Sequence, residues 1–231
     1  MKNCLINCSI ESWYPKGGRR LKNSLNSVDF TGDILISEKY PIGCPSHKQV
    51  PYAFKIYKFI EAKNKGYKNV LWVDSSFYAI KNIDEVFNYI ESNGWLLHNS
   101  GHNVGTWSTD KSLEGFNLSR DDAFKIPMFS GGLIGLNFKN NIANEFLNQL
   151  FAKTKDGSFV GAWRNINESV SKDPRVQGHR HDMTIGSVIS NRLNMNMVPT
   201  NTFWTQTGWY NKYKDDLNLD TSKICFLAQG M

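Results

Sequence analysis

The sequence predicts an α/β fold, in which a mainly parallel β-sheet is flanked by helices within a single domain covering residues 1–231. Strand-like and helix-like segments alternate along the chain, the order that is typical of such sheets. No internal repeat, low-complexity tract or flexible linker divides the sequence. Hydrophobic residues make up 40% of the 231 positions, which is enough to form one substantial core.

In the first part of the chain, apolar runs of strand length are separated by segments with helical spacing. The uninterrupted apolar run at 70–73 is typical of a strand buried on both faces. The clearest helix begins near Pro51, since proline fits a first helical turn, and ends before Gly66. We expect strands at 5–10, 32–37 and 70–73, helices at 21–27 and 51–65, and a polar loop at 14–20.

The second part of the chain continues the alternation but contains two long polar stretches. Loops of more than about 15 residues in a compact domain are often functional. The tail after residue 200 is aromatic and polar. We expect helices at 83–93, 119–126, 142–153 and 182–192, strands at 95–98, 133–138 and 197–198, and loops at 99–118 and 156–181.

The composition also bears on the location of the protein. No stretch approaches 18 consecutive apolar residues, and the first ten residues are too polar for a signal peptide, so we expect a cytoplasmic protein. Cys4 and Cys8 would lie about 13 Å apart on one strand, which is too far for a disulfide. A Cys44–Cys225 disulfide stays open, although free thiols fit a chain without a secretory signal.

The formal net charge of +6 favours an anionic partner. Nucleic acid, an acidic lipid surface and a phosphorylated ligand all meet this condition. The alternative is an ordinary solvated surface, because many of the lysines fall where helix ends and loops carry them.

Polar or glycine-rich segments adjoin three of the expected strands and helices. Ligands of open α/β sheets bind beyond the carboxyl ends of the strands, which makes Asp74, directly after the run at 70–73, a candidate ligand for a divalent cation or a ribose hydroxyl. A turn or cap role for Asp74 is an equally good interpretation. The glycine pair at 131–132 allows close approach of a ligand, or forms a tight turn. The run His179-Arg180-His181-Asp182 opens a helix: Asp182 is its N-cap, or the two histidines and the aspartate supply a metal ligand or a catalytic carboxylate.

The order of these motifs resembles that of the GT-A glycosyltransferases, over roughly residues 3–200. That family has a strand ending in Asp-x-Asp, a Gly-Gly-like turn before a later strand, and a downstream Asp-Gln at a helix start. The matching segments here are Asp74-Ser75-Ser76, Ser130-Gly131-Gly132 and His181-Asp182-Met183.

The resemblance implies a nucleotide-sugar donor, and it gives each motif a role. Asp74, Ser75 and Ser76 would contact the donor. Ser76 stands in the place of the second carboxylate, so a Mn²⁺ or Mg²⁺ ion held by Asp74 and Ser76 would be bound weakly. Ser130, Gly131 and Gly132 would lie against the donor sugar. Asp182 would lie near the anomeric carbon, beside His181, and the two are the catalytic candidates.

Cationic and aromatic residues complete the expected site. Lys16, Arg19 and Arg20 follow the first strand, where these enzymes seat the nucleotide, and Lys55 is a further candidate for the diphosphate. Surface charge is an equally good interpretation of all four. Several tryptophans and a tyrosine are candidates for stacking on a sugar or nucleobase, or for packing: Trp107, Trp163, Trp204, Trp209 and Tyr210.

Three hypotheses about function follow from this resemblance. The first is a glycosyltransferase that moves a sugar from a UDP- or GDP-sugar to a glycan or lipid-linked sugar. The second keeps the donor and takes a nucleic-acid base as acceptor, as virus-type DNA glucosyltransferases do. The third is a catalytically silent module that binds sugar nucleotides, because Ser76 replaces an acid.

Overall fold

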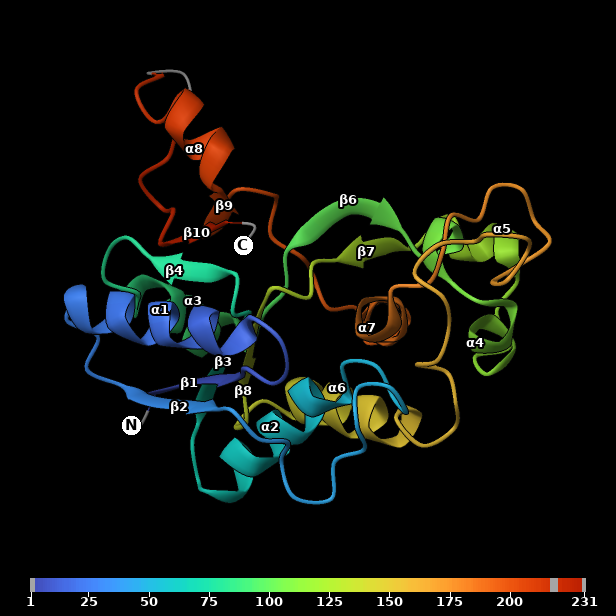
Figure 1. Ribbon diagram of the computed structural model, residues 1–231, viewed down its shortest axis with the longest axis horizontal. Coiled ribbons are helices and arrows are strands. Elements are labelled where there is room, and N and C mark those ends of the chain that lie inside the picture. The colour runs from blue at the N-terminus through green and yellow to red at the C-terminus, as the bar shows by residue number, and fades with distance from the viewer. Residues whose placement is uncertain (1–2, 217–219, 230–231) are drawn as a thin grey trace.

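A five-stranded β-sheet lies at the centre of the protein (Figure 1). The structure, a computed structural model, describes residues 3–216 and 220–229. The strands of the sheet are β1 (Asn3–Cys8), β2 (Asp33–Ser37), β3 (Asn69–Val73), β5 (Trp95–Leu96) and β8 (Leu133–Asn137). Their order is β2-β1-β3-β8-β5, with β1 parallel to β2 and β3, and β8 antiparallel to β3 and β5. Four of the five strands therefore run in the same direction, and only β8 runs in the opposite one. This mainly parallel sheet confirms the predicted fold class.

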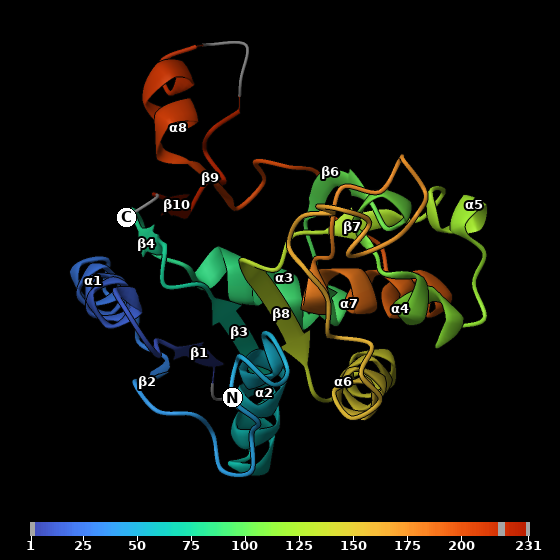
Figure 2. The ribbon, with the colours of Figure 1, turned by 45° about the vertical axis from the view of Figure 1, so that its right-hand side comes forward.

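Helices cover both faces of this sheet (Figures 1 and 2). On one face lie α1 (Tyr14–Ser27) and α3 (Asp84–Asn93), and on the other lie α2 (Ala53–Asn64) and α6 (Asn141–Lys153). Strand β3 contributes to both apolar layers, since Val70 and Trp72 pack on the α2 side while Leu71 and Val73 pack on the α1 side. The alternation confirms that this strand is buried on both faces.

A second group of elements extends the molecule beyond β8. The strands β6 (Asn99–Asn103) and β7 (Pro127–Phe129) pair antiparallel, and α7 (His181–Arg192) packs between β7 and α6. Three short elements lie between β6 and β7: a 3₁₀ helix at Gly105–Trp107, α4 (Asp110–Glu114) and α5 (Arg120–Ala123). Residues 154–180 form the expected long loop, which is tied down by hydrogen bonds such as that from Gln177 N to Thr106 O (2.9 Å).

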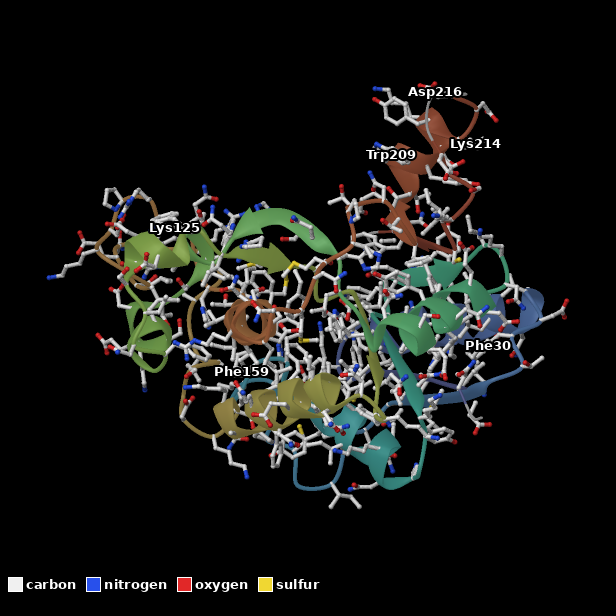
Figure 3. All side chains as sticks on the ribbon, turned by 180° about the vertical axis from the view of Figure 1, so that it is seen from behind. Phe30, Lys125, Phe159, Trp209, Lys214 and Asp216 are labelled. Atoms are coloured by element: carbon white, nitrogen blue, oxygen red, sulfur yellow. The ribbon has the colours of Figure 1, made fainter. Side chains whose placement is uncertain are left out.

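The C-terminal segment folds back onto the loop that follows β3. It forms a three-stranded sheet in the order β4-β10-β9, made of β4 (Phe77–Ala79), β10 (Phe226–Ala228) and β9 (Trp204–Gln206). The backbone N–H of Gln229 donates to the carbonyl of Ser76 at 3.0 Å, which anchors the segment beside Asp74. Between β9 and β10, α8 (Thr207–Tyr213) stands away from the body of the protein, with Trp209 on it (Figure 3).

Several predicted elements differ from the observed ones. The segment 14–20 is helical rather than a loop, and Gly17 and Gly18 are buried within the helix. At Gly18 the helix packs closely, since a Cβ there would fall on Ser9 and lie 3.2 Å from the Ile36 side chain. The stretch 99–118 contains β6, the 3₁₀ helix and α4. The expected strand at 197–198 is reduced to an isolated bridge between Val198 and His98, and β9, α8 and β10 were not anticipated in the tail.

The structure also bears on membrane-spanning helices and on the pairing of the cysteines. Within residues 3–216 and 220–229, no helix has the length and the apolar content that crossing a bilayer requires. None of the four cysteines, all of which the structure describes, forms a disulfide: Cys4, Cys8, Cys44 and Cys225. Burial raises the pKa of the Cys8 thiol to about 11, so it is protonated and unreactive at neutral pH.

A first prediction concerns Gly135 in β8, where the sheet contacts α3. A Cβ at this position would fall on the fully buried Ile90 side chain and lie 3.0 Å from the Cβ of Leu96. We therefore expect Gly135→Ala to lower the free energy of unfolding by about 1–3 kcal/mol, as overpacking of a core does. Urea denaturation checks this value, with Gly208→Ala in α8 as the control, because a Cβ there has no neighbour within 4 Å. An equal loss in both variants would contradict the packing argument.

Candidate functional site

The ammonium group of Lys55 lies at the centre of the site and joins segments far apart in the sequence. Its Nζ is 3.0 Å from Asp182 Oδ2 and 3.3 Å from Asp74 Oδ1, and it donates to the carbonyl of Gly131 at 2.9 Å. These partners come from the start of α7, the loop after β3 and the turn before β8. The structure thus brings together three of the predicted motifs around one lysine.

The local backbone explains how Lys55 reaches this place. Tyr52 adopts a left-handed conformation (φ 62°) that turns the chain into α2, so Lys55 lies in the first turn of the helix. The ammonium lies 5.0 Å from the centre of the Tyr52 ring and 5.5 Å from that of Trp72. Aromatic faces attract a cation that has left water, which makes burial of the lysine tolerable.

Asp74 and Asp182 differ in their exposure. The side chain of Asp74 is 35% exposed, whereas that of Asp182 is 6% exposed. Trp72 Nε1 donates to Asp74 Oδ1 at 2.7 Å, and the N–H of Asp74 donates to Gly132 O at 2.9 Å. Asp74 is therefore held in place while part of its carboxylate remains open to solvent, whereas Asp182 is enclosed.

Burial and the shared lysine shift the pKa values of the buried groups. Burial would lower the pKa of Lys55, but the nearby carboxylates of Asp182 and Asp74 outweigh this effect and raise it, so Lys55 is a cation at neutral pH. Burial raises the pKa of Asp182, and the negative charge of Asp74 adds to this, while Lys55 opposes both. One ammonium group is thus shared by two carboxylates.

The two serines after Asp74 face different surroundings. Ser75 is buried, and its hydroxyl lies 3.0 Å from that of Ser9 and accepts from Asn7 Nδ2 at 3.2 Å. This network fixes the carboxyl ends of β1 and β3 against each other. The backbone carbonyl of Ser76 accepts from Arg20 Nη2 at 2.7 Å, which positions the loop after β3.

Two adjoining cavities meet at the lysine. The first, of about 180 Å³, extends from the end of β1 to α2 and contains aromatic side chains, including Trp13 and Tyr14, whose rings stack at 4.1 Å. The second, of about 220 Å³, lies between the Gly-Gly turn, the start of α7 and the C-terminal segment. Both cavities are lined by Tyr52, Lys55, Asp74 and Ser76.

The paired glycines make room in the second cavity. A Cβ at Gly131 would lie 3.1 Å from both Lys55 Nζ and Asp182 Oδ2, and a Cβ at Gly132 would lie 2.8 Å from the ring of Phe77. A side chain at either position would therefore crowd the charged cluster or the cavity wall. Ser130, the third residue of the predicted turn, also lines this cavity.

His181 lies beside the site rather than in it. Its Nδ1 is 2.8 Å from the carbonyl of Phe159, and its ring contacts Tyr52 and Trp163, which line the second cavity. The buried Nε2 has no hydrogen-bond partner among the described residues. Burial lowers the pKa of His181 to about 4, so the ring is neutral at pH 7.

Three of the cationic residues predicted to bind the donor do not lie near Lys55. Lys16, Arg19 and Arg20 lie on α1 and line neither cavity, because this segment is helical and directs them to the surface or to other partners. Arg19 forms an exposed ion pair with Glu38 at 3.0 Å. Arg20 lies over the Tyr78 ring and holds the carbonyl of Ser76.

Sequence reasoning missed several of the residues that line the cavities. Trp13, Tyr14 and His47 line the first cavity, and Arg180 lines the second. Met183, which belongs to a predicted motif but had no predicted role, also lines the second cavity. The adjacent aromatic pair directly after the first strand is a signal that was available in the sequence. The position of His47 had no such signal, since it depends on the path of the chain between β2 and α2.

The residues present do not form a good site for a divalent metal ion. Mn²⁺ and Mg²⁺ prefer several oxygen ligands, and no group of three or more His, Cys, Asp or Glu side chains suited to a metal occurs in the described part of the chain. Asp74 Oδ1 already accepts from Trp72 and faces the Lys55 ammonium, whose positive charge would repel a second cation.

Two solved glycosyltransferase structures are similar to this chain over nearly its whole length. One is a crystal structure of a glycosyltransferase involved in the glycosylation of the major capsid of PBCV-1, with a TM-score of 0.56, 13% identity, and coverage of 99% of this chain and 93% of that chain. The other is the apo structure of WbbM, a bifunctional glycosyltransferase, with a TM-score of 0.51 and 11% identity, covering 99% of this chain and 45% of that one. No protein-family model and no curated protein matches the sequence.

The chain therefore has a glycosyltransferase fold, which confirms the fold predicted from the order of the motifs. At 11–13% identity the likeness concerns the fold alone. The chemistry of the site depends on its own residues.

A second prediction concerns acid stability, because three histidines are buried and neutral. Burial lowers the pKa of His98 and of His179 to about 3, and that of His181 to about 4. In the unfolded chain these rings bind a proton near pH 6.5, so folding stability is present above that pH and is lost as the pH falls toward 4. We expect the free energy of unfolding to fall as the pH drops from 7 to 5, with a slope that approaches about 1.4 kcal/mol per pH unit for each histidine once the rings of the unfolded chain are protonated.

Urea denaturation at pH 7, 6 and 5 measures this dependence. His179→Gln keeps a donor for the carbonyl of Ser158, to which the His179 ring lies at 3.1 Å, and should remove about a third of the slope. The control is His102→Gln, a replacement of the same kind at an exposed position. A stability that does not vary over this range would contradict the neutral, buried state of the rings.

Proposed function

We propose that the protein is a glycosyltransferase that takes a sugar from a nucleoside-diphosphate donor. The observation that carries this proposal is the cluster of Lys55, Asp74 and Asp182 at the junction of two cavities, in a chain with a glycosyltransferase fold. Buried ionisable groups that interact with one another and face a cavity are typical of active sites.

The shapes of the cavities suggest where the parts of the donor bind. The first cavity suits a nucleobase and ribose, because the stacked pair Trp13–Tyr14 offers an aromatic surface and Asp74 is an acceptor for a ribose hydroxyl. The sugar would occupy the second cavity against the backbone of Gly131 and Gly132. The diphosphate would then lie between them, near Lys55 and Ser76.

Breaking of the glycosidic bond separates charge, and the cluster provides both signs. Negative charge develops on the departing diphosphate oxygen, which the Lys55 ammonium stabilises. Positive charge develops on the sugar ring, which the carboxylate of Asp182 stabilises from the base of the cavity. The groups are oriented by their mutual contacts before the donor arrives, so little reorganisation is needed.

A third prediction tests this assignment through Asp182→Asn. The variant keeps the shape of the side chain and leaves Lys55 paired with Asp74, so we expect a stable protein whose turnover of the donor falls by about 100-fold or more. Release of nucleoside diphosphate from UDP- and GDP-sugars, with and without saccharide acceptors, measures the turnover.

The matched control is Glu61→Gln. It also removes a carboxylate from a buried lysine of α2, since Lys58 Nζ lies 2.9 Å from Glu61, but neither residue lines the two cavities. Its turnover should stay within about twofold of the parent protein. If the parent protein releases nucleoside diphosphate from none of the donors, the result would instead support a silent binding module. Full activity of Asp182→Asn would contradict the assignment of the site.

We further propose that Lys55 supplies the positive charge for which other enzymes use a divalent cation. The ammonium already occupies the space between the two carboxylates, and Ser76 stands where a second acidic ligand would be needed.

The fourth prediction is therefore that donor turnover persists in EDTA. We expect less than about a twofold loss after chelation and dialysis, because the groups that stabilise charge belong to the chain. Restoration of activity by Mn²⁺ or Mg²⁺ after a complete loss in EDTA would show that a metal ion is required.

A further inference from the structure

One wall of the second cavity is built from an arginine enclosed by two tryptophans. The guanidinium carbon of Arg180 lies 3.6 Å from the ring centre of Trp107 and 4.3 Å from that of Trp163. Trp107 comes from the 3₁₀ helix after β6, and Trp163 comes from the long loop 154–180. Two segments distant in sequence thus fix the plane of this side chain at the cavity.

Arg180 carries a positive charge that no carboxylate neutralises. Within residues 3–216 and 220–229 it has no ion-pair partner, and its Nη1 alone donates hydrogen bonds, to Trp163 O (2.8 Å) and His179 O (3.4 Å). The two carboxylates of the same cavity are held by Lys55. The Nε and Nη2 donors of Arg180 therefore remain for a ligand, and an arginine keeps its charge at any physiological pH.

Trp163 adds an apolar surface beside this charge. The residue is 47% exposed, although large aromatic side chains are usually covered, and it lines the second cavity. Its ring makes edge contacts with Tyr52 at 6.1 Å and His181 at 5.4 Å, which hold it in place. A fixed, half-exposed indole is a surface on which the C–H face of a sugar ring packs well.

The position of this wall distinguishes it from the donor region. Lys55, Asp74 and Ser76 line both cavities, whereas Arg180 and Trp163 line only the second, which also contains Asp182. If the nucleotide occupies the first cavity, Arg180 and Trp163 lie beyond the transferred sugar, on the side from which an acceptor approaches.

We propose that Arg180 and Trp163 form an acceptor subsite for a saccharide that carries an anionic group, a carboxylate or a phosphate. The sugar ring packs on Trp163 while the anion accepts hydrogen bonds from the free edge of Arg180, the geometry in which guanidinium groups bind such anions. This inference rests on the proposed glycosyltransferase function and adds the chemical class of its acceptor. The net charge of +6 also favours an acidic partner.

The fifth prediction compares acidic and neutral probes that differ in one group. Methyl β-D-glucuronide and methyl β-D-glucoside differ only at C6, as do the corresponding galactose derivatives, and glucose 6-phosphate tests the phosphate form. Isothermal titration of the protein saturated with UDP or GDP should show at least one acidic probe binding about 10-fold or more tightly than its neutral counterpart. Arg180→Gln should abolish this preference, and Arg180→Lys should retain part of it.

The matched control is Arg192→Gln. Arg192 also lies over an aromatic ring, that of Phe116 at 5.2 Å, and also donates to a backbone carbonyl, but it lines neither cavity. Its substitution should leave the preference unchanged. Circular dichroism of both variants verifies that they are folded.

Several outcomes would overturn the proposal: equal binding of acidic and neutral probes, no binding of any probe, or a preference that survives Arg180→Gln. A loss of UDP and GDP affinity in Arg180→Gln would assign this arginine to the donor diphosphate instead. Because the titration measures binding, its result is independent of turnover. Failure of the proposed function appears separately, as the absence of nucleoside-diphosphate release by the parent protein.

Discussion

The burial of one lysine between two carboxylates organises this protein. A buried ammonium without a partner would cost several kcal/mol, so the placement of Lys55 requires Asp74, Asp182 and the carbonyl of Gly131 to converge on it. That convergence joins α2, the loop after β3, the turn before β8 and the start of α7. The interaction is therefore both a structural link and the main concentration of charge in the site.

The sheet provides the frame on which this cluster depends. Strand β3 is buried on both faces, which fixes its end and hence the position of Asp74. The antiparallel strand β8 begins beside that end, so the N–H of Asp74 bonds to Gly132 and the two motifs are neighbours. The C-terminal segment then covers the same edge through β10 and contributes Trp204 to the second cavity. Two cavities thus adjoin one charged centre.

Local sequence patterns predicted those elements of the fold that depend mainly on residues close together in the sequence. The apolar run of β3, the glycine after α2 and the alternation of strands and helices all depend on neighbours in the sequence, and the structure confirms them. Pro51, expected in the first turn of α2, lies before it, because the left-handed Tyr52 is the residue that leads into the helix. The segment 14–20 was predicted wrongly as a loop, because it is polar and contains a pair of glycines. Gly18 instead lets α1 approach Ser9 and strand β2 closely, a tertiary requirement that composition does not reveal.

The sequence by itself determined the fold class, the three motifs and their order, because these follow from periodicity and from residue types at the ends of strands. Only the tertiary structure decided which charges meet. It placed Lys55 between Asp74 and Asp182, directed Arg19 toward Glu38, and enclosed Arg180 between two tryptophans. The physical reason is that a charge is stabilised by whatever lies within a few ångströms of it, and those neighbours come from segments that only folding brings together.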